Sequence, residues 1–104
     1  MARFLVTYHG GGGMPDTPEG REQVMQAFMA WAGKTGSALV DPGAPVGEAR
    51  TVSSAAVQPG AADGPVGGYS VLEADDIDAA VALVQDHPFV GRGGSLQVSQ
   101  AVTP

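Results

Sequence analysis

The 104-residue sequence contains no cysteine and only one lysine, Lys34. Without cysteine the chain has no disulfide framework, no thiol nucleophile and no thiolate ligand for a metal. The formal net charge is −6, because eleven acidic residues outnumber five Lys and Arg residues. Nucleic acids and anionic membranes are bound by basic surfaces. We therefore expect neither a nucleic acid nor a membrane as a partner.

Long apolar runs are also missing. A helix that spans a bilayer needs roughly 20 apolar residues, and the first residues lead into an alternating segment rather than into the apolar block of a signal peptide. These features predict a cytoplasmic protein. The apolar share of 43% is largely Ala and Val, so we expect one domain over residues 1–104 with a modest core. Pairing with a second copy would bury further surface.

The clearest pattern lies in residues 67–88. Residues 69–74 alternate between two faces, which predicts a strand. Asp75 or Asp76 can then cap a helix by accepting hydrogen bonds from its first N–H groups, and Pro88 predicts the end of that helix. Four apolar residues at helical spacing predict its buried face: Ile77, Ala80, Val81 and Val84.

The first half of the chain repeats this strand-then-helix pattern. Residues 3–9 alternate, and Thr17 followed by Pro18 is a helix start, with a hydroxyl cap and proline in the first turn. An apolar stripe predicts the buried face of the first helix: Val24, Met25, Phe28, Met29, Trp31 and Ala32. Strands are expected at 37–41 and 48–57, an exposed loop at 58–66, and a last strand at 95–102.

This order of elements predicts an α+β, ferredoxin-like βαββαβ fold, with a four-stranded antiparallel sheet and both helices on one face. The short strand at 37–41 is an optional element in this prediction. The other face of the sheet would carry partly apolar residues, Leu5 or Phe4 and Val71 or Leu72. A face-to-face or edge-closed homodimer would cover that face.

Several segments are similar, in their order, to one known family: Tyr8-His9-Gly10-Gly11-Gly12, Trp31, 36–43, Arg50-Thr51-Val52, Asp63-Gly64-Pro65 and 67–75. The set resembles the YCII-related family, in the branch named for a DGPF motif, over nearly the whole chain. The resemblance implies a dimeric α+β barrel, in which two ferredoxin-like sheets enclose a cavity. It also implies an unassigned function, since most members of that family have no assigned reaction.

Some positions differ from the family's pattern. Val66 stands where the DGPF motif has Phe, and the first helix lacks the histidine that members with a proposed His–Asp pair carry. The aspartate of that pair precedes a Pro-aromatic dipeptide, whereas here His87 precedes Pro88. The family's dyad is therefore not carried over as a pair.

His9 and Asp41 are the candidate catalytic residues. His9 ends the first predicted strand, and an imidazole suits acid–base chemistry near neutral pH. Asp41 ends the next short strand and would orient His9 if the two strand ends are adjacent. The structural alternatives are a histidine bonded to the strand edge and a turn aspartate bonded to its own backbone.

Four further residues are candidates for ligand binding: Tyr69, Arg50, His87 and Asp63. Each also has a structural alternative. Arg50 can pair with Glu73 across the predicted sheet, and Tyr69 can pack in the core. His87 can lie as a cation at a helix C-terminus, and Asp63 can be a turn residue.

The glycine run 10–13 offers backbone N–H groups to an anion. It lacks the Lys-Ser/Thr ending of a phosphate-binding loop, however, and the G-x-G-x-x-G register fails at Pro15. The two histidines have no metal-ligand spacing, and no G-x-S-x-G motif is present. We expect neither a metal nor any other cofactor.

Together these features predict a small homodimeric protein that binds a compact, partly apolar molecule in a barrel cavity. Cofactor-free isomerase, lyase or monooxygenase-type acid–base chemistry is one option for it. The other option is a non-catalytic ligand-sensing or assembly module associated with a regulatory protein. The missing histidine on the first helix favours the second option.

Overall fold

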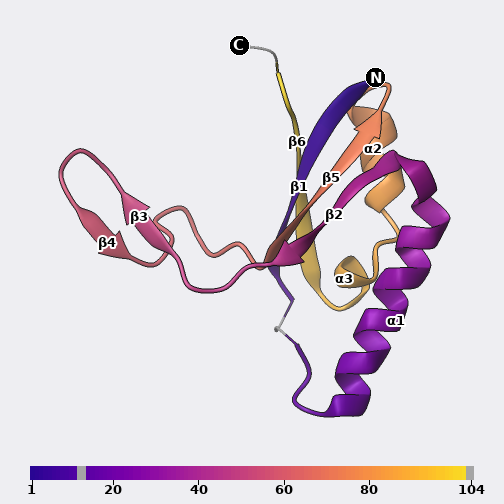
Figure 1. Cartoon of the computed structure of the whole chain (residues 1–104), viewed down its shortest axis with the longest axis horizontal. Coiled ribbons are helices and arrows are strands. Elements are labelled where there is room, and N and C mark those ends of the chain that lie inside the picture. The colour runs from indigo at the N-terminus through magenta and orange to yellow at the C-terminus, as the bar shows by residue number, and fades with distance from the viewer. Residues whose placement is uncertain (12–13, 103–104) are drawn as a thin grey trace.

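The computed structural model describes residues 1–11 and 14–102. Four antiparallel strands form a sheet in the order β2-β5-β1-β6, and the helices lie on one side of it (Figure 1). The strands are β1 (Ala2–Gly10), β2 (Leu39–Pro45), β5 (Gly68–Ala74) and β6 (Gly94–Gln100). The helices are α1 (Pro18–Thr35), the 3₁₀ turn η1 (Gly36–Ala38), α2 (Ile77–Val84) and α3 (Pro88–Gly91). This α+β architecture is compatible with the ferredoxin-like fold predicted from the sequence.

Both predicted helix starts are confirmed. Thr17 Oγ1 accepts a hydrogen bond from the Gly20 N–H at 3.0 Å, and Pro18 is the first residue of α1. Asp76, rather than Asp75, caps α2 by accepting a hydrogen bond from the Ala79 N–H at 2.8 Å. These caps form because each side-chain oxygen replaces a helical acceptor that the first turn lacks.

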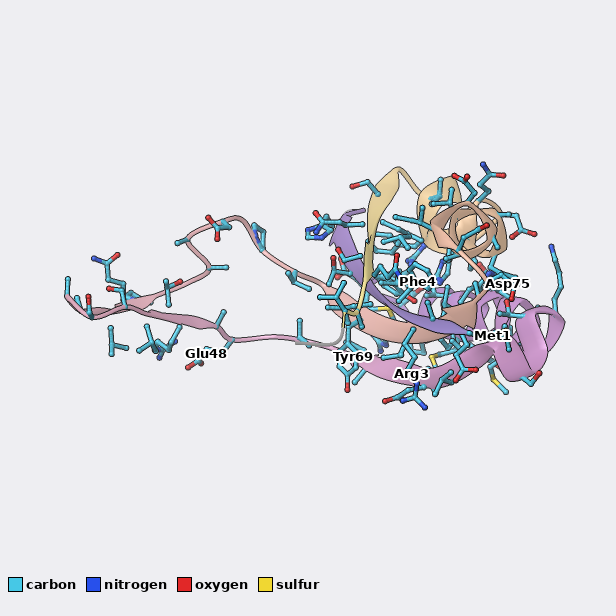
Figure 2. The ribbon with its side chains drawn as sticks, turned by 90° about the horizontal axis from the view of Figure 1, so that it is seen from above. Met1, Arg3, Phe4, Glu48, Tyr69 and Asp75 are labelled. Carbon is cyan, nitrogen blue, oxygen red and sulfur yellow. The ribbon has the colours of Figure 1, made fainter. Side chains whose placement is uncertain are left out.

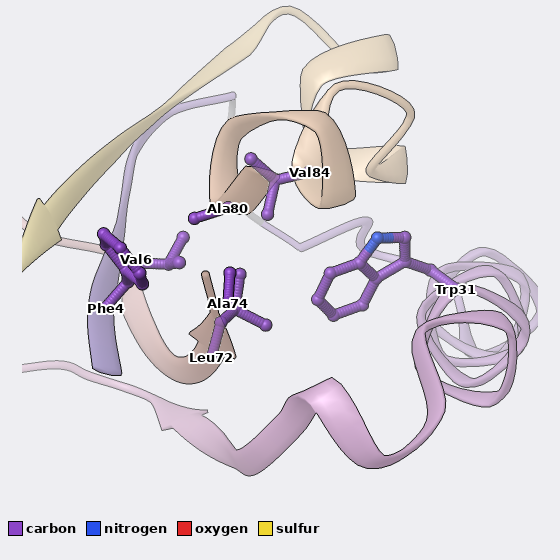
Figure 3. Packing of buried hydrophobic residues seen from close by; sticks show 7 residues of the cluster. All are labelled: Phe4, Val6, Trp31, Leu72, Ala74, Ala80 and Val84. Carbon is purple, nitrogen blue, oxygen red and sulfur yellow. The ribbon is translucent and has the colours of Figure 1, made fainter. Parts of the chain in front are cut away.

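The core lies between the sheet and the helices. Alternation along β1 and β5 directs every second side chain toward the helices, and a cluster of buried apolar residues fills the space between them (Figure 3). Its members are Phe4, Val6, Trp31, Leu72, Ala74, Ala80 and Val84. The Trp31 indole N–H donates a hydrogen bond to the Leu83 carbonyl at 2.9 Å, which ties α1 to α2. Full burial of a side chain such as Phe4 or Leu72 contributes about 2 kcal/mol.

The predicted buried faces of both helices are only partly correct. On α1, Trp31 is buried, but Met25 and Met29 are 53% and 65% exposed. On α2, Ile77 and Val81 are exposed as well. The core is small, and only Trp31 on α1 and Ala80 and Val84 on α2 are buried, so only a narrow stripe of each helix meets other side chains.

The prediction that Pro88 ends the second helix is also wrong. The helix α2 ends three residues earlier than expected, at Val84, and Pro88 instead opens the short helix α3 as its first residue. Proline is well suited to that position because the N–H it lacks would have no helical partner there.

The predicted strand at 48–57 does not enter the sheet. It supplies β3 (Arg50–Val52) and the first residue of β4 (Val57–Pro59), and these two strands pair only with each other. The fourth sheet strand is β2, which continues through the expected turn at Pro42-Gly43. Gly43 has φ 74°, and the register of β2 against β5 shifts beside it. The strand therefore continues past Pro42-Gly43, where the sequence predicted that it would end.

Residues 46–67 form an arm that projects from one end of the sheet and carries β3 and β4 (Figures 1 and 2). At its base Val46 N donates to the Gly67 carbonyl at 3.0 Å, and Gly67 N donates to the Tyr8 carbonyl at 2.7 Å. The turn predicted around Asp63 is confirmed, since Gly64 N donates to the Ala61 carbonyl. The radius of gyration is 14.9 Å, whereas a compact domain of this length has about 13 Å.

Within residues 1–11 and 14–102, no helix covers the opposite side of the sheet. Figure 2 shows Phe4 and Arg3 on opposite sides of β1. We call the uncovered side the open face, and its residues on β1 and β5 are Arg3, Leu5, Thr7, His9, Tyr69, Val71 and Glu73. Leu5 is 43% exposed there. Among the described residues, the helices are too short or too polar to cross a membrane.

Candidate functional site

A pocket of about 320 Å³ lies on the helix side of the sheet, between α1, α3 and the adjoining ends of β1, β2 and β5. Its wall is mostly apolar and includes Met14, Val24, Met25, Phe28, Pro45 and Phe89. The polar residues in its lining are Tyr8, Tyr69, His87 and Arg92. The alternation of β5 directs the Tyr69 side chain to the open face. The cavity expected from the sequence was the space between two facing sheets, whereas this pocket lies within one chain.

His87 forms part of the pocket wall. It follows Val84 by three residues and continues the inner stripe of α2, and Pro88 holds it in an extended conformation at ψ 135°. Only 3% of its surface is exposed. Aromatic rings surround the imidazole, with the Trp31 ring centre at 4.3 Å and the Tyr8 ring edge-on at 5.1 Å.

A chain of hydrogen bonds fixes the tautomer of His87. Its Nδ1 accepts from the Phe89 N–H at 3.0 Å, so the ring proton resides on Nε2, which donates to the Tyr8 hydroxyl at 3.1 Å. Tyr8 donates in turn to Ser70 Oγ at 2.7 Å, and Ser70 donates to the Pro42 carbonyl at 2.8 Å. This direction follows because a carbonyl only accepts and each hydroxyl has one proton. The chain joins four elements, and each of its protons has an acceptor.

Burial keeps both ring systems neutral. Loss of solvent, with a smaller effect of the Arg92 charge, lowers the pKa of His87 from 6.5 to about 4. Burial also raises the pKa of Tyr8, although its hydrogen bond with Ser70 opposes that rise. The alternative interpretation of His87 as a cation at a helix C-terminus is therefore wrong, because His87 is a neutral N-cap of α3.

Phe89 needs two glycines beside it. A Cβ atom on Gly11 would lie 2.8 Å from the ring, and one on Gly94 would overlap it. Gly11 also has φ 83°, which disfavours any other residue. This part of the predicted glycine run thus makes room for an aromatic ring, while residues 12 and 13 of that run lie outside the described residues.

The structure does not bring His9 and Asp41 together. They lie on β1 and β2, and β5 runs between these strands. Asp41 is opposite Val71, which pairs with Leu5, four residues before His9. At about 3.3 Å per residue this offset alone is about 13 Å.

Both residues make the local contacts that were their structural alternatives. The His9 ring lies 2.8 Å from Thr7 Oγ1 through Nε2 and 3.3 Å from the Pro65 carbonyl through Nδ1. Asp41 Oδ1 accepts from the Gly43 N–H at 2.8 Å, which is the bond of a turn aspartate.

The four predicted ligand-binding residues divide into two pairs. His87 and Tyr69 line the pocket, whereas Arg50 and Asp63 lie on the arm. The alternative role of Arg50 is wrong, because its guanidinium pairs with Glu48 at 2.8 Å. Glu73 pairs with Arg3 at 3.5 Å instead.

Sequence reasoning missed Tyr8, Ser70 and Arg92. A signal existed for Ser70, which is a polar residue on the strand face that otherwise carries Leu72 and Ala74. Tyr8 shares the face of Phe4 and Val6, but the sequence did not decide whether this face or the face of Leu5 meets the helices. Nothing in the local sequence distinguished Arg92 from other loop arginines.

No family model, no curated protein and no solved structure matches this chain. Among residues 1–11 and 14–102, no three His, Asp or Glu side chains gather in a way that would hold a metal ion.

Proposed function

We propose that the protein binds a small, largely apolar molecule in the pocket beneath α1. The observation that carries the proposal is an apolar pocket of about 320 Å³ with a neutral, hydrogen-bonded His87–Tyr8 pair in its wall. This volume is at the lower end of the range of small-molecule sites, about 300–1,000 Å³, and such sites combine an apolar wall with few polar groups.

Of the two options that the sequence left open, the non-catalytic ligand-sensing module has more support. A general base needs a lone pair within reach of the substrate. Both nitrogens of His87 are used by Phe89 and Tyr8, and no carboxylate lines the pocket. Isomerase, lyase or monooxygenase-type chemistry would have to break this chain of hydrogen bonds first.

Thermal shift with a panel of small aromatic alcohols and amides tests the binding proposal. Met25→Trp would fill the pocket, and Met29→Trp is the matched control one helical turn further on, where the side chain lies outside the pocket lining. Ligands that stabilise the wild type should also stabilise the control and should have no effect on Met25→Trp. A hit that binds all three proteins equally, or a panel without any hit, would refute the proposal.

We further propose that the protein is a cytoplasmic homodimer of YCII-related type, with its two open faces together in an α+β barrel. The chain exposes 6845 Å², whereas a compact monomer of 10.4 kDa exposes about 5400 Å². This excess includes the exposed arm of residues 46–67, and each partner of a standard interface buries roughly 800 Å². Leu5, Val71 and Tyr69 on the open face are the apolar residues available for it.

Sedimentation equilibrium tests the dimer. The wild type should have twice the mass of one chain, and Leu5→Glu should shift it toward monomer, because it places a charge in the centre of the interface. Met29→Glu, on the outer side of α1, is the control and should remain dimeric. A monomeric wild type would contradict the proposal directly.

A further inference from the structure

Among the described residues, Arg92 is the only one in the lining of the pocket that carries a charge. It follows α3 as its C-cap, so the helix fixes where its backbone lies. Its guanidinium carbon is 5.4 Å from the centre of the Phe89 ring, which is itself part of the pocket wall. No Asp or Glu lines the same pocket. The charge carried by the lining itself is therefore positive, although the chain as a whole carries −6.

Arg92 is also the one cationic side chain without a polar side-chain or carbonyl partner within the part of the chain that the structure describes. Arg3, Lys34 and Arg50 each form a salt bridge, and the Arg21 guanidinium donates to two backbone carbonyls. Arg92 is an exposed residue at the edge of the pocket, so its N–H donors are open to a ligand although the chain has eleven acidic residues.

The apolar pocket and the arginine together define a ligand class. A guanidinium presents parallel N–H donors that match the two oxygens of a carboxylate. The neutral Tyr8 and His87 do not repel an anion, and at physiological ionic strength screening over about 8 Å limits the effect of the distant acidic residues. The apolar wall formed by Met25 and Phe28 suits a ring or a branched hydrocarbon.

On the basis of the proposed pocket, we propose that its ligand is a compact apolar monocarboxylic acid, with the carboxylate paired to Arg92 and the hydrocarbon part packed against Phe28. A neutral analogue of the same shape would fill the same space but would lack the charged hydrogen bonds. Arg92 is then the residue that determines specificity.

Isothermal titration with matched probes tests this assignment: phenylacetate and 3-phenylpropionate against phenylacetamide and 3-phenylpropionamide. The wild type should bind the acids about 10- to 100-fold more tightly than the amides. Arg92→Met should abolish that preference and leave amide affinity unchanged. Arg92→Lys should restore only part of it, because a lysine cannot form the bidentate pair. Arg21→Met, which removes an exposed arginine outside the pocket lining, is the control and should behave as the wild type.

The outcomes distinguish this inference from the proposal on which it rests. If the wild type binds acids and amides equally, or if Arg92→Met keeps the preference for acids, the inference is wrong while the pocket remains a binding site. If neither acids nor amides bind at millimolar concentration, both proposals fail. The melting temperature of each variant, measured without ligand, confirms that it is folded.

Discussion

The hydroxyl of Tyr8 lies 3.1 Å from Nε2 of His87, although 79 positions separate the two residues in the sequence. This bond links β1 to the segment between α2 and α3, and Ser70 extends it to β5. It also closes one wall of the pocket. The hydrogen bonds that join these elements and the wall of the pocket therefore involve the same few polar groups.

Tyr8→Phe should lower the free energy of unfolding by about 1–3 kcal/mol, because it leaves the His87 N–H buried without an acceptor. Urea denaturation measures this loss. Tyr69→Phe is the matched control, since the described residues offer its hydroxyl no hydrogen-bond partner, and its effect should be within about 0.5 kcal/mol. Equal losses in the two variants would show that the bond to His87 contributes nothing.

The stability of the protein should depend on pH through His87. Its pKa is about 4 in the folded chain and near 6.5 when unfolded. Between these values the unfolded state binds more protons, so the free energy of unfolding rises with pH from 4 to 6.5. The contribution is complete above pH 6.5, is lost as pH falls to 4, and amounts to at most about 3 kcal/mol.

Urea denaturation at several pH values checks this dependence. His87→Asn, which keeps a capping oxygen for the Phe89 N–H, should flatten the slope between pH 4 and 6.5. His9→Gln replaces the only other histidine and should retain the slope. If His87→Asn keeps the slope of the wild type, groups other than His87 cause the pH dependence of the free energy of unfolding.

Gly94→Ala should destabilise the protein by about 1–3 kcal/mol, because the added Cβ atom would overlap the Phe89 ring in a packed site. Gly33→Ala is the control of opposite sign. Gly33 lies inside α1 with open space around it, so alanine there should stabilise the helix by up to about 1 kcal/mol. Thermal denaturation measures the stability of both variants. If Gly94→Ala is as stable as the wild type, the Phe89 ring moves freely.

Asp76→Ala should cost about 1 kcal/mol, because it removes the cap of α2. Asp75→Ala, at the neighbouring exposed position, changes the charge by the same amount and should have a much smaller effect. Chemical denaturation of the two variants compares them directly. Similar losses would mean that the general negative charge near the helix start, and not the cap, provides the stabilisation.

Much of the local structure could be predicted from the sequence. The alternation in β1 and β5 and the caps Thr17 and Asp76 depend on contacts within a few residues, so the sequence contains the necessary information. The continuation of β2 past Pro42-Gly43 could not be predicted, because the same dipeptide suits a turn and a bulge equally well. Only pairing with β5 decides between the two.

The candidate site was less predictable than the fold. His9 and Asp41 were joined on the assumption that their strand ends are adjacent, but strand order in a sheet is not a local property, and β5 lies between them. His87, a predicted ligand-binding candidate, does line the pocket, yet its neutral state depends on rings contributed by Tyr8 and Trp31. Burial by distant segments, rather than the residue type, lowers its pKa.

The sequence by itself determined which segments are strands and helices over most of the chain, where the two long helices begin, and that both helices lie on one side of an antiparallel sheet. The strands and helices follow from side-chain periodicity and from hydrogen bonds between near neighbours, and the placement of both helices on one side follows from the order of the elements. The tertiary structure decided that residues 46–67 leave the sheet as an arm, and that Tyr8, Ser70 and His87 meet beside a pocket with Arg92 at its edge. Such contacts depend on which strands pair and in what register, and the energy of that choice is distributed over the whole core rather than encoded at any one position.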